Sequence, residues 1–142
     1  MWDRLTFGDL MQIAATLYEV PVEILEQRVC IFRAQMSLAA PFIRIHGALF
    51  HRDPVERAVI CAMRVIQSRP FPGDRNTEVG FWCMREMLLR SHYVWLRPTE
   101  DAEEIEEVLR QVEARTMSDA DFLRWVRERV ELGTGLDGGP TA

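Results

Sequence analysis

A charged loop with the composition of an anion site separates two helical patterns at residues 68–81, SRPFPGDRNTEVGF. The segment contains two prolines, two glycines, two arginines, two acidic residues and one asparagine. Prolines and glycines interrupt helices, and guanidinium groups bind carboxylates and phosphates. A helix that begins after Asn76 would also direct its unpaired amide groups toward the loop. These residues therefore predict a loop that can hold an anion.

The same residues also allow a purely structural interpretation. Arg69, Arg75 and Glu78 would suit a solvated loop with an internal ion pair. Asn76 and Thr77 could cap the helix that follows, since either side chain can accept hydrogen bonds from the free amides of its first turn. Both interpretations stay open at this point.

The composition excludes several kinds of chemistry. All 17 basic residues are arginines, so Schiff-base catalysis, a P-loop lysine and a lysine general base are excluded. The net charge of -5 and the pI near 5.2 argue against nucleic-acid binding, which needs a basic face. The three cysteines, Cys30, Cys61 and Cys83, lie in apolar helical patterns and are expected to be buried thiols. We expect neither a cofactor nor a metal.

The chain has the length and composition of one soluble domain. Its 142 residues are 48% hydrophobic, and no apolar run approaches the ~18 to 20 residues of a membrane span. The N-terminus lacks the pattern of a signal peptide, so we expect a cytoplasmic protein without a membrane partner. We expect one domain over residues 1–132 and a flexible glycine-rich tail over residues 133–142.

Helical periodicity dominates the elements around the loop. A capping-box pattern at Thr6 and Asp9 opens a first helix, and a second is expected from Pro21 to about Leu38. The irregular segment 39–51 precedes a third helix, which begins at the cap Asp53 and runs into the loop. The fourth, after the loop, is apolar nearly all round and is expected to be central and buried.

Two more helices are expected to close the fold. Residues 90–98 predict an extended crossover, after which Thr99 opens a fifth helix and Ser118, with Asp121, opens a sixth. The acidic run 99–113 predicts a solvated face, with a basic protein partner as the alternative. That acidic face and exposed tryptophans would also allow a homo-oligomer. The expected class is all-α, a compact bundle of about six helices.

This order of elements around RPFPGDRN resembles that of the small Fic/Doc family, whose compact members are all-helical. In that family the loop reads H-x-F-x-D/E-G-N-K-R and lies between two core helices. The segments LTFGDL and VEILEQRV are also similar to the family's first two helices, so the resemblance covers nearly the whole chain. Phe71 matches the phenylalanine that anchors the loop, and Asp74 and Asn76 match the acid and the asparagine if one extra residue is allowed before Asp74.

The other motif positions differ from the family pattern. Here Arg69 replaces the catalytic histidine, Arg75 the glycine, Thr77 the lysine, and Glu78 the phosphate-binding arginine. Arginine keeps its proton at ordinary pH and is a poor base. A carboxylate about 4 Å from a phosphate would cost about 4 kcal/mol at an effective dielectric of 20. Standard transfer of AMP or phosphate is therefore not expected.

The resemblance implies roles for eight residues. Those near any reacting group would be Arg69, Asp74, Glu78 and His46. Those in contact with a ligand would be Phe71, Arg75, Asn76 and Thr77. His46 and His51 fall in the irregular segment, which in the family folds as a flap beside the loop, and could supply a replacement base. Surface or capping histidines are the simpler interpretation.

Three functions follow as hypotheses. The first is a diverged enzyme or small-ligand binder that takes a small polar or anionic molecule at loop 69–78, as in a specialised biosynthetic step. The second is a catalytically inactive, toxin-derived module that acts through a protein partner. The third is residual adenylyl or phosphoryl transfer with a base from the flap.

Overall fold

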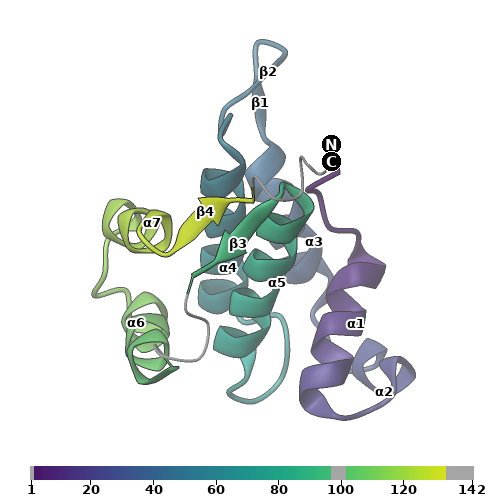
Figure 1. The fold of residues 1–142 in the computed structure, drawn as a ribbon. Helices are drawn as coiled ribbons and strands as arrows, with labels where there is room; N and C mark the ends of the chain where they lie inside the picture. Colours follow the sequence, from purple (N-terminus) through teal and green to yellow (C-terminus); the bar gives the residue numbers. More distant parts are fainter. Residues whose placement is uncertain (1, 97–101, 134–142) are drawn as a thin grey trace.

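The computed structural model describes residues 2–96 and 102–133. Over these residues the chain is predominantly helical, which confirms the all-α class (Figure 1). The helices are α1 (Phe7–Tyr18), α2 (Val22–Glu26), α3 (Ile31–Ala39), α4 (Pro54–Ser68), α5 (Asn76–Arg90), α6 (Ala102–Ala114) and α7 (Asp119–Arg127), and a 3-10 turn η1 (Ala40–Phe42) follows α3. The strands are β1 (Arg44–Ile45), β2 (Ala48–Leu49), β3 (Tyr93–Trp95) and β4 (Val130–Leu132).

The predicted helix starts at Thr6, Asp53 and Ser118 are confirmed. At α1 the Thr6 hydroxyl accepts from the Asp9 amide at 3.0 Å, and the Asp9 carboxylate accepts from the Thr6 amide at 2.8 Å. At α4 and α7 the side chains of Asp53 and Ser118 accept hydrogen bonds from amides of the first turn. The predicted start of the fifth helix at Thr99 lies outside the described residues.

The sequence predicted one continuous helix from Pro21 to about Leu38, and this prediction is wrong. Residues 27–30 separate α2 from α3, and the Cys30 amide donates to the Pro70 carbonyl at 2.7 Å. This bond directs the Cys30 amide to the distant loop, and Cys30 precedes α3 in an extended conformation. The break therefore depends on a contact between residues 40 positions apart, which local periodicity does not reveal.

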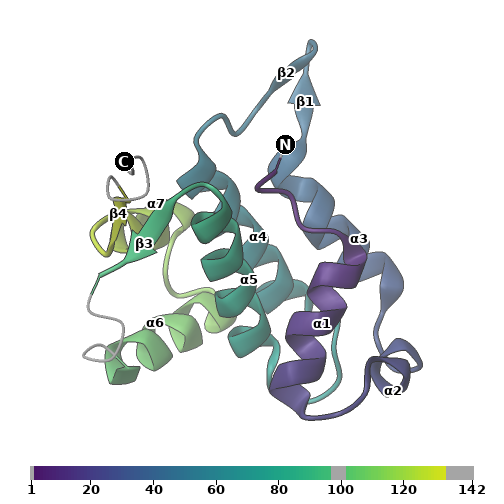
Figure 2. The same cartoon turned by 45° about the vertical axis from the view of Figure 1, so that its right-hand side comes forward.

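The α4–α5 pair is the centre of the molecule, with α1 and α3 on one side and α6 and α7 on the other (Figures 1 and 2). The pair is joined by loop 69–75, and α5 also contacts α1, α6 and β3. Buried side chains from these elements form one hydrophobic cluster. The predicted central position of α5 is confirmed, although Trp82 and Leu89 on one strip of it are exposed by 45% and 56%.

Two small antiparallel sheets complete the fold. The irregular segment 39–51 contains η1 and the β1–β2 hairpin, in which Arg44 pairs with Leu49. The predicted crossover is extended as β3 and pairs with β4, so that Tyr93 lies opposite Leu132 and Trp95 opposite Val130. The sequence pattern did not predict these strands, because each is only two or three residues long.

Candidate functional site

Loop 69–75 is held in place by hydrogen bonds from its own polar side chains. Arg69 ends α4 in a left-handed conformation, with φ 52° and ψ 64°. Its guanidinium donates to the Gly73 carbonyl at 2.8 Å and pairs with Glu113 of α6. The ion pair expected for Arg69 therefore reaches another helix, and Glu78 is not its partner. This side chain both closes the loop and connects it to α6.

Asn76, the first residue of α5, binds the buried residue Phe71 of the loop. The Asn76 side chain accepts from the Phe71 amide at 3.0 Å and donates to the Phe71 carbonyl at 2.9 Å. Both residues are buried, and the Phe71 ring lies 6.1 Å from the Tyr18 ring. Asn76 therefore holds the loop backbone through a side chain that solvent does not reach, and it does not cap the first turn of α5.

Tyr18 and Arg75 connect the loop to α1. The Tyr18 hydroxyl donates to the Pro72 carbonyl at 2.6 Å, and Arg75 donates to the Leu17 carbonyl at 2.6 Å. Burial raises the pKa of Tyr18, so its hydroxyl remains a neutral donor at physiological pH. Asp74 and Glu78 are exposed, and neither makes a hydrogen bond or ion pair with another described residue. Thr77 is half-buried beside them.

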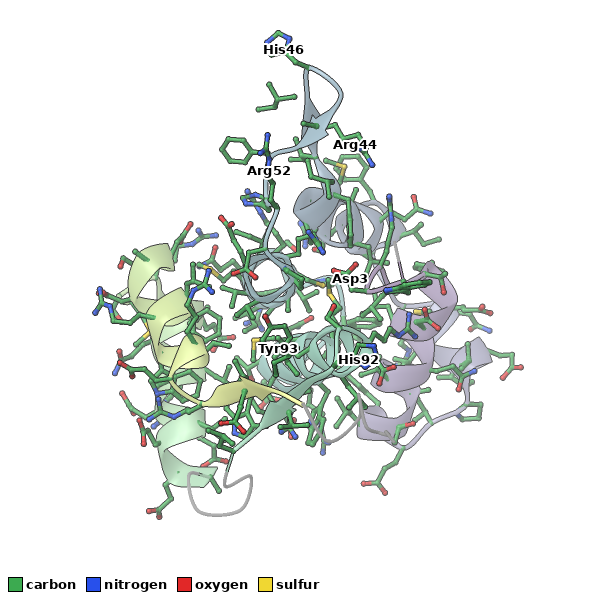
Figure 3. The ribbon with its side chains drawn as sticks, turned by 45° about the horizontal axis from the view of Figure 1, so that its top comes forward. Asp3, Arg44, His46, Arg52, His92 and Tyr93 are labelled. Atoms are coloured by element: carbon green, nitrogen blue, oxygen red, sulfur yellow. The ribbon has the colours of Figure 1, made fainter. Side chains whose placement is uncertain are left out.

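The two histidines of segment 39–51 lie far from the loop. His46 is at the tip of the β1–β2 hairpin, which projects from the body of the molecule (Figure 3). The hairpin precedes the first residue of α4 and the loop follows its last residue, so the two lie at opposite ends of this helix (Figure 1). The 15 residues of α4 span about 22 Å. The expectation that His46 lies beside the loop is therefore wrong, because α4 separates the two. His51, before α4, bonds instead to Glu56 at 2.9 Å.

A groove elsewhere on the molecule has the geometry of a ligand site. It lies between α1, α5 and β3 and has a volume of about 650 Å³. Ligand pockets in proteins commonly measure about 300 to 1,000 Å³. Its apolar wall consists of Ile13 and Leu17 from α1, Trp82 and Leu89 from α5, and Val94 and Trp95 from β3. None of the eight residues selected from the sequence lines this groove.

Arg85 places a positive charge in the wall of this groove. The carbon that joins its guanidinium nitrogens lies 5.1 Å from the centre of the Trp95 ring, 5.3 Å from Trp82 and 5.7 Å from Phe81. Arg85 makes no hydrogen bond or ion pair with another described residue. Burial lowers the pKa of the Arg85 guanidinium, which nevertheless stays charged at physiological pH. The groove therefore contains a partly desolvated cation that aromatic rings stabilise.

The other charged side chain of the groove already has a partner. Glu86 accepts from Arg90 at 3.0 Å, and Arg90 also approaches Asp9 of α1 at 3.3 Å. This network connects α1 to α5 at the edge of the groove. Because the Glu86 carboxylate pairs with Arg90, it does not neutralise Arg85.

The sequence contained a signal for this groove that helical periodicity alone could not interpret. Trp82, Arg85 and Leu89 follow one another at spacings of three and four, which places them on one strip of α5. The apolar residues all around α5 predicted complete burial. They did not distinguish the strip that faces α4 from the strip that faces the groove.

No protein-family profile, curated protein or solved structure matches the chain. In the described residues, no group of three histidines, cysteines or acidic residues is arranged to hold a metal ion. Among the described helices, none combines the length and apolarity required to cross a bilayer.

Proposed function

We propose that this chain is a Fic/Doc-like protein that has lost nucleotidyl and phosphoryl transfer and acts as a binding protein. One observation carries the proposal: the loop uses its arginines and its asparagine to bind its own protein. Arg69 bonds to Gly73 and Glu113, Arg75 bonds to Leu17, and Asn76 bonds to Phe71. A phosphate at the loop would have to compete with these bonds.

The chemistry of the loop supports the same proposal. Transfer to a hydroxyl needs a base with a pKa near neutrality and fixed positive charge around the phosphates. His46 and His51 lie at the opposite end of α4 from the loop, and Arg69 is no base. Glu78 adds an exposed carboxylate in the first turn of the helix whose amides would face the phosphates.

The order of the elements supports the relation to the Fic/Doc family. A helix, a loop anchored by a buried phenylalanine, a central helix, an extended crossover and two closing helices follow one another as the resemblance implies. We therefore base the proposed relation on topology together with RPFPGDRN. We base the proposed loss of transfer on the bonds that the loop arginines and Asn76 make to the protein itself.

Incubation with radiolabelled ATP and a cell lysate tests the loss of transfer. We expect no labelled protein where an active Fic protein, run in parallel, gives labelled bands. We also expect ATP and inorganic phosphate to leave the NMR resonances of residues 69–78 unchanged at millimolar concentration. A labelled band that Glu78→Ala strengthens, or phosphate-dependent shifts at Arg69 and Arg75, would show that the loop still binds or transfers phosphate.

A further inference from the structure

We propose that the groove between α1, α5 and β3 binds an amphipathic carboxylate, a small molecule with an apolar chain or ring and one carboxylate that pairs with Arg85. The inference rests on the proposed function in one respect, namely that the protein acts as a binding protein, and it places the binding site in the groove. It adds the chemical class of the ligand. Three observations carry it: the apolar walls, the size of the groove, and a cation, Arg85, that pairs with no side chain in residues 2–96 and 102–133.

The walls determine the apolar part of the ligand. The exposed Trp82 and Leu89 face the groove from α5, and Val94 and Trp95 close it from β3. Exposed apolar surface of this kind gains about 25 cal/mol for each Å² that a ligand removes from water. The large side chains of α5 and β3 would therefore favour a chain or ring over a sugar or a nucleotide phosphate.

Arg85 determines the polar end. A guanidinium group that is partly removed from water and has no carboxylate partner among the described residues favours an anion that can use its planar donors. A carboxylate matches this geometry with one negative charge. A triphosphate would bring several charges to a groove whose other charged side chain is the acidic Glu86. Charge complementarity therefore favours a monocarboxylate.

The second polar feature of the same wall is Trp95. Its ring is buried against Arg85, Phe81 and Trp125, and its indole N–H has no hydrogen-bond partner among the described residues. A ligand that draws Arg85 away from this ring would change the environment of the indole. The Trp95 indole resonance is therefore a reporter of occupancy that does not depend on any activity.

Calorimetric titration of the 142-residue protein with decanoate, paired with the neutral 1-decanol, tests the proposal. We expect one decanoate per chain, binding at least tenfold tighter than 1-decanol. Amide shifts should be confined to α1, α5 and β3, together with a shift of the Trp95 indole. The Arg85→Gln variant should bind decanoate about tenfold more weakly or worse, since a charge-assisted hydrogen bond is lost. Arg85→Lys should retain part of the affinity because it keeps the charge.

The control is Arg124→Gln. Arg124 is an exposed arginine on α7, paired with Asp121, and it does not line the groove. It should leave decanoate binding unchanged. Circular dichroism of each variant verifies the fold, and the comparison of decanoate with 1-decanol needs no variant at all.

Three results would overturn the proposal. Equal binding of decanoate and 1-decanol would remove the role of Arg85, and absence of binding at millimolar decanoate would remove the ligand class. A dimer that Leu89→Arg dissociates, in a protein that takes up no decanoate, would assign the groove to a second copy. These results are independent of ATP labelling, so failure of this inference and failure of the proposed function are distinguishable.

Discussion

A few polar side chains hold the loop in its conformation. Asn76 uses both the oxygen and the nitrogen of its amide on one residue, Phe71, five positions earlier in the chain, and thereby holds the loop backbone. Arg69 and Arg75 then fasten that loop to α6 and α1. Arg69, Arg75 and Asn76, three polar residues that would suit a ligand site, thus each have a structural role.

Asn76→Ala should lower the free energy of unfolding by about 2 to 4 kcal/mol, because it leaves the buried amide and carbonyl of Phe71 without partners. Urea denaturation followed by circular dichroism measures the change. The control is Thr77→Ala at the next position, where no side-chain hydrogen bond to a described residue is lost, and the expected change is below about 1 kcal/mol. Equal effects of the two variants would contradict the closing role of Asn76.

At the scale of elements, the close approach of α4 and α5 depends on Gly80. A Cβ at this position would lie 2.7 Å from Cγ1 of Ile66 and 2.9 Å from the carbonyl oxygen of Ala62. Contacts that short require the two helices to separate, since one of the two atoms belongs to the backbone of α4. The glycine therefore determines how closely the central pair can pack.

Gly80→Ala should destabilise the protein by about 1 to 2 kcal/mol, since the overpacking penalty exceeds the gain of about 1 kcal/mol in helix propensity. Gly8→Ala in α1 is the matched control, because a Cβ there meets only the Thr6 hydroxyl at 3.7 Å. That variant should be neutral or slightly stabilising. Thermal unfolding of both variants measures the difference, and a stabilised Gly80→Ala protein would disprove the close contact.

The sequence predicted the elements whose signals are local and missed those that depend on distant contacts. The caps at Thr6, Asp53 and Ser118 were predictable because each cap bonds to an amide two or three residues away. The break before α3 was not predictable, because Cys30 bonds to Pro70. The pairing of β3 with β4 likewise joins segments separated by the whole of α6 and α7.

In the candidate site, too, the features with local signals were predictable and those that depend on distant contacts were not. The loop and its boundaries followed from prolines and glycines, whereas the direction of each arginine depends on where α1 and α6 pack. Asn76 accordingly looked like a helix cap or a ligand contact, and the structure shows it bound to Phe71. The groove required knowledge of which strip of α5 stays uncovered, which is a property of the assembled helices.

At the scale of the whole molecule, the absence of lysine leaves an alkaline pH window in which few groups titrate. Cys61 and Cys83 are both fully buried in the core. Burial raises the pKa of Cys61 to about 12 and that of Cys83 well above its ordinary value. In the unfolded chain both thiols would ionise near pH 8.5. The folded chain therefore retains protons that the unfolded chain releases.

Stability should fall as the pH rises from about 8.5 toward 12, because over that range the folded state binds more protons than the unfolded state. The contribution of the buried thiols is fully present below pH 8.5. Urea midpoints measured between pH 7 and pH 10.5 test this dependence. A Cys61→Ala variant should show a shallower decline, and a slope unchanged by that substitution would exclude Cys61 as a source.

The pairing of β3 with β4 affects the order in which the elements of this protein can assemble during synthesis. Val94 and Trp95 form one wall of the groove, and their strand finds its partner only in residues 130–132. A chain emerging from the ribosome can therefore assemble α1, α4 and α5 before that wall has anything to pair with. In nascent chains stalled before Val130, the β3 wall of the groove would lack its partner strand.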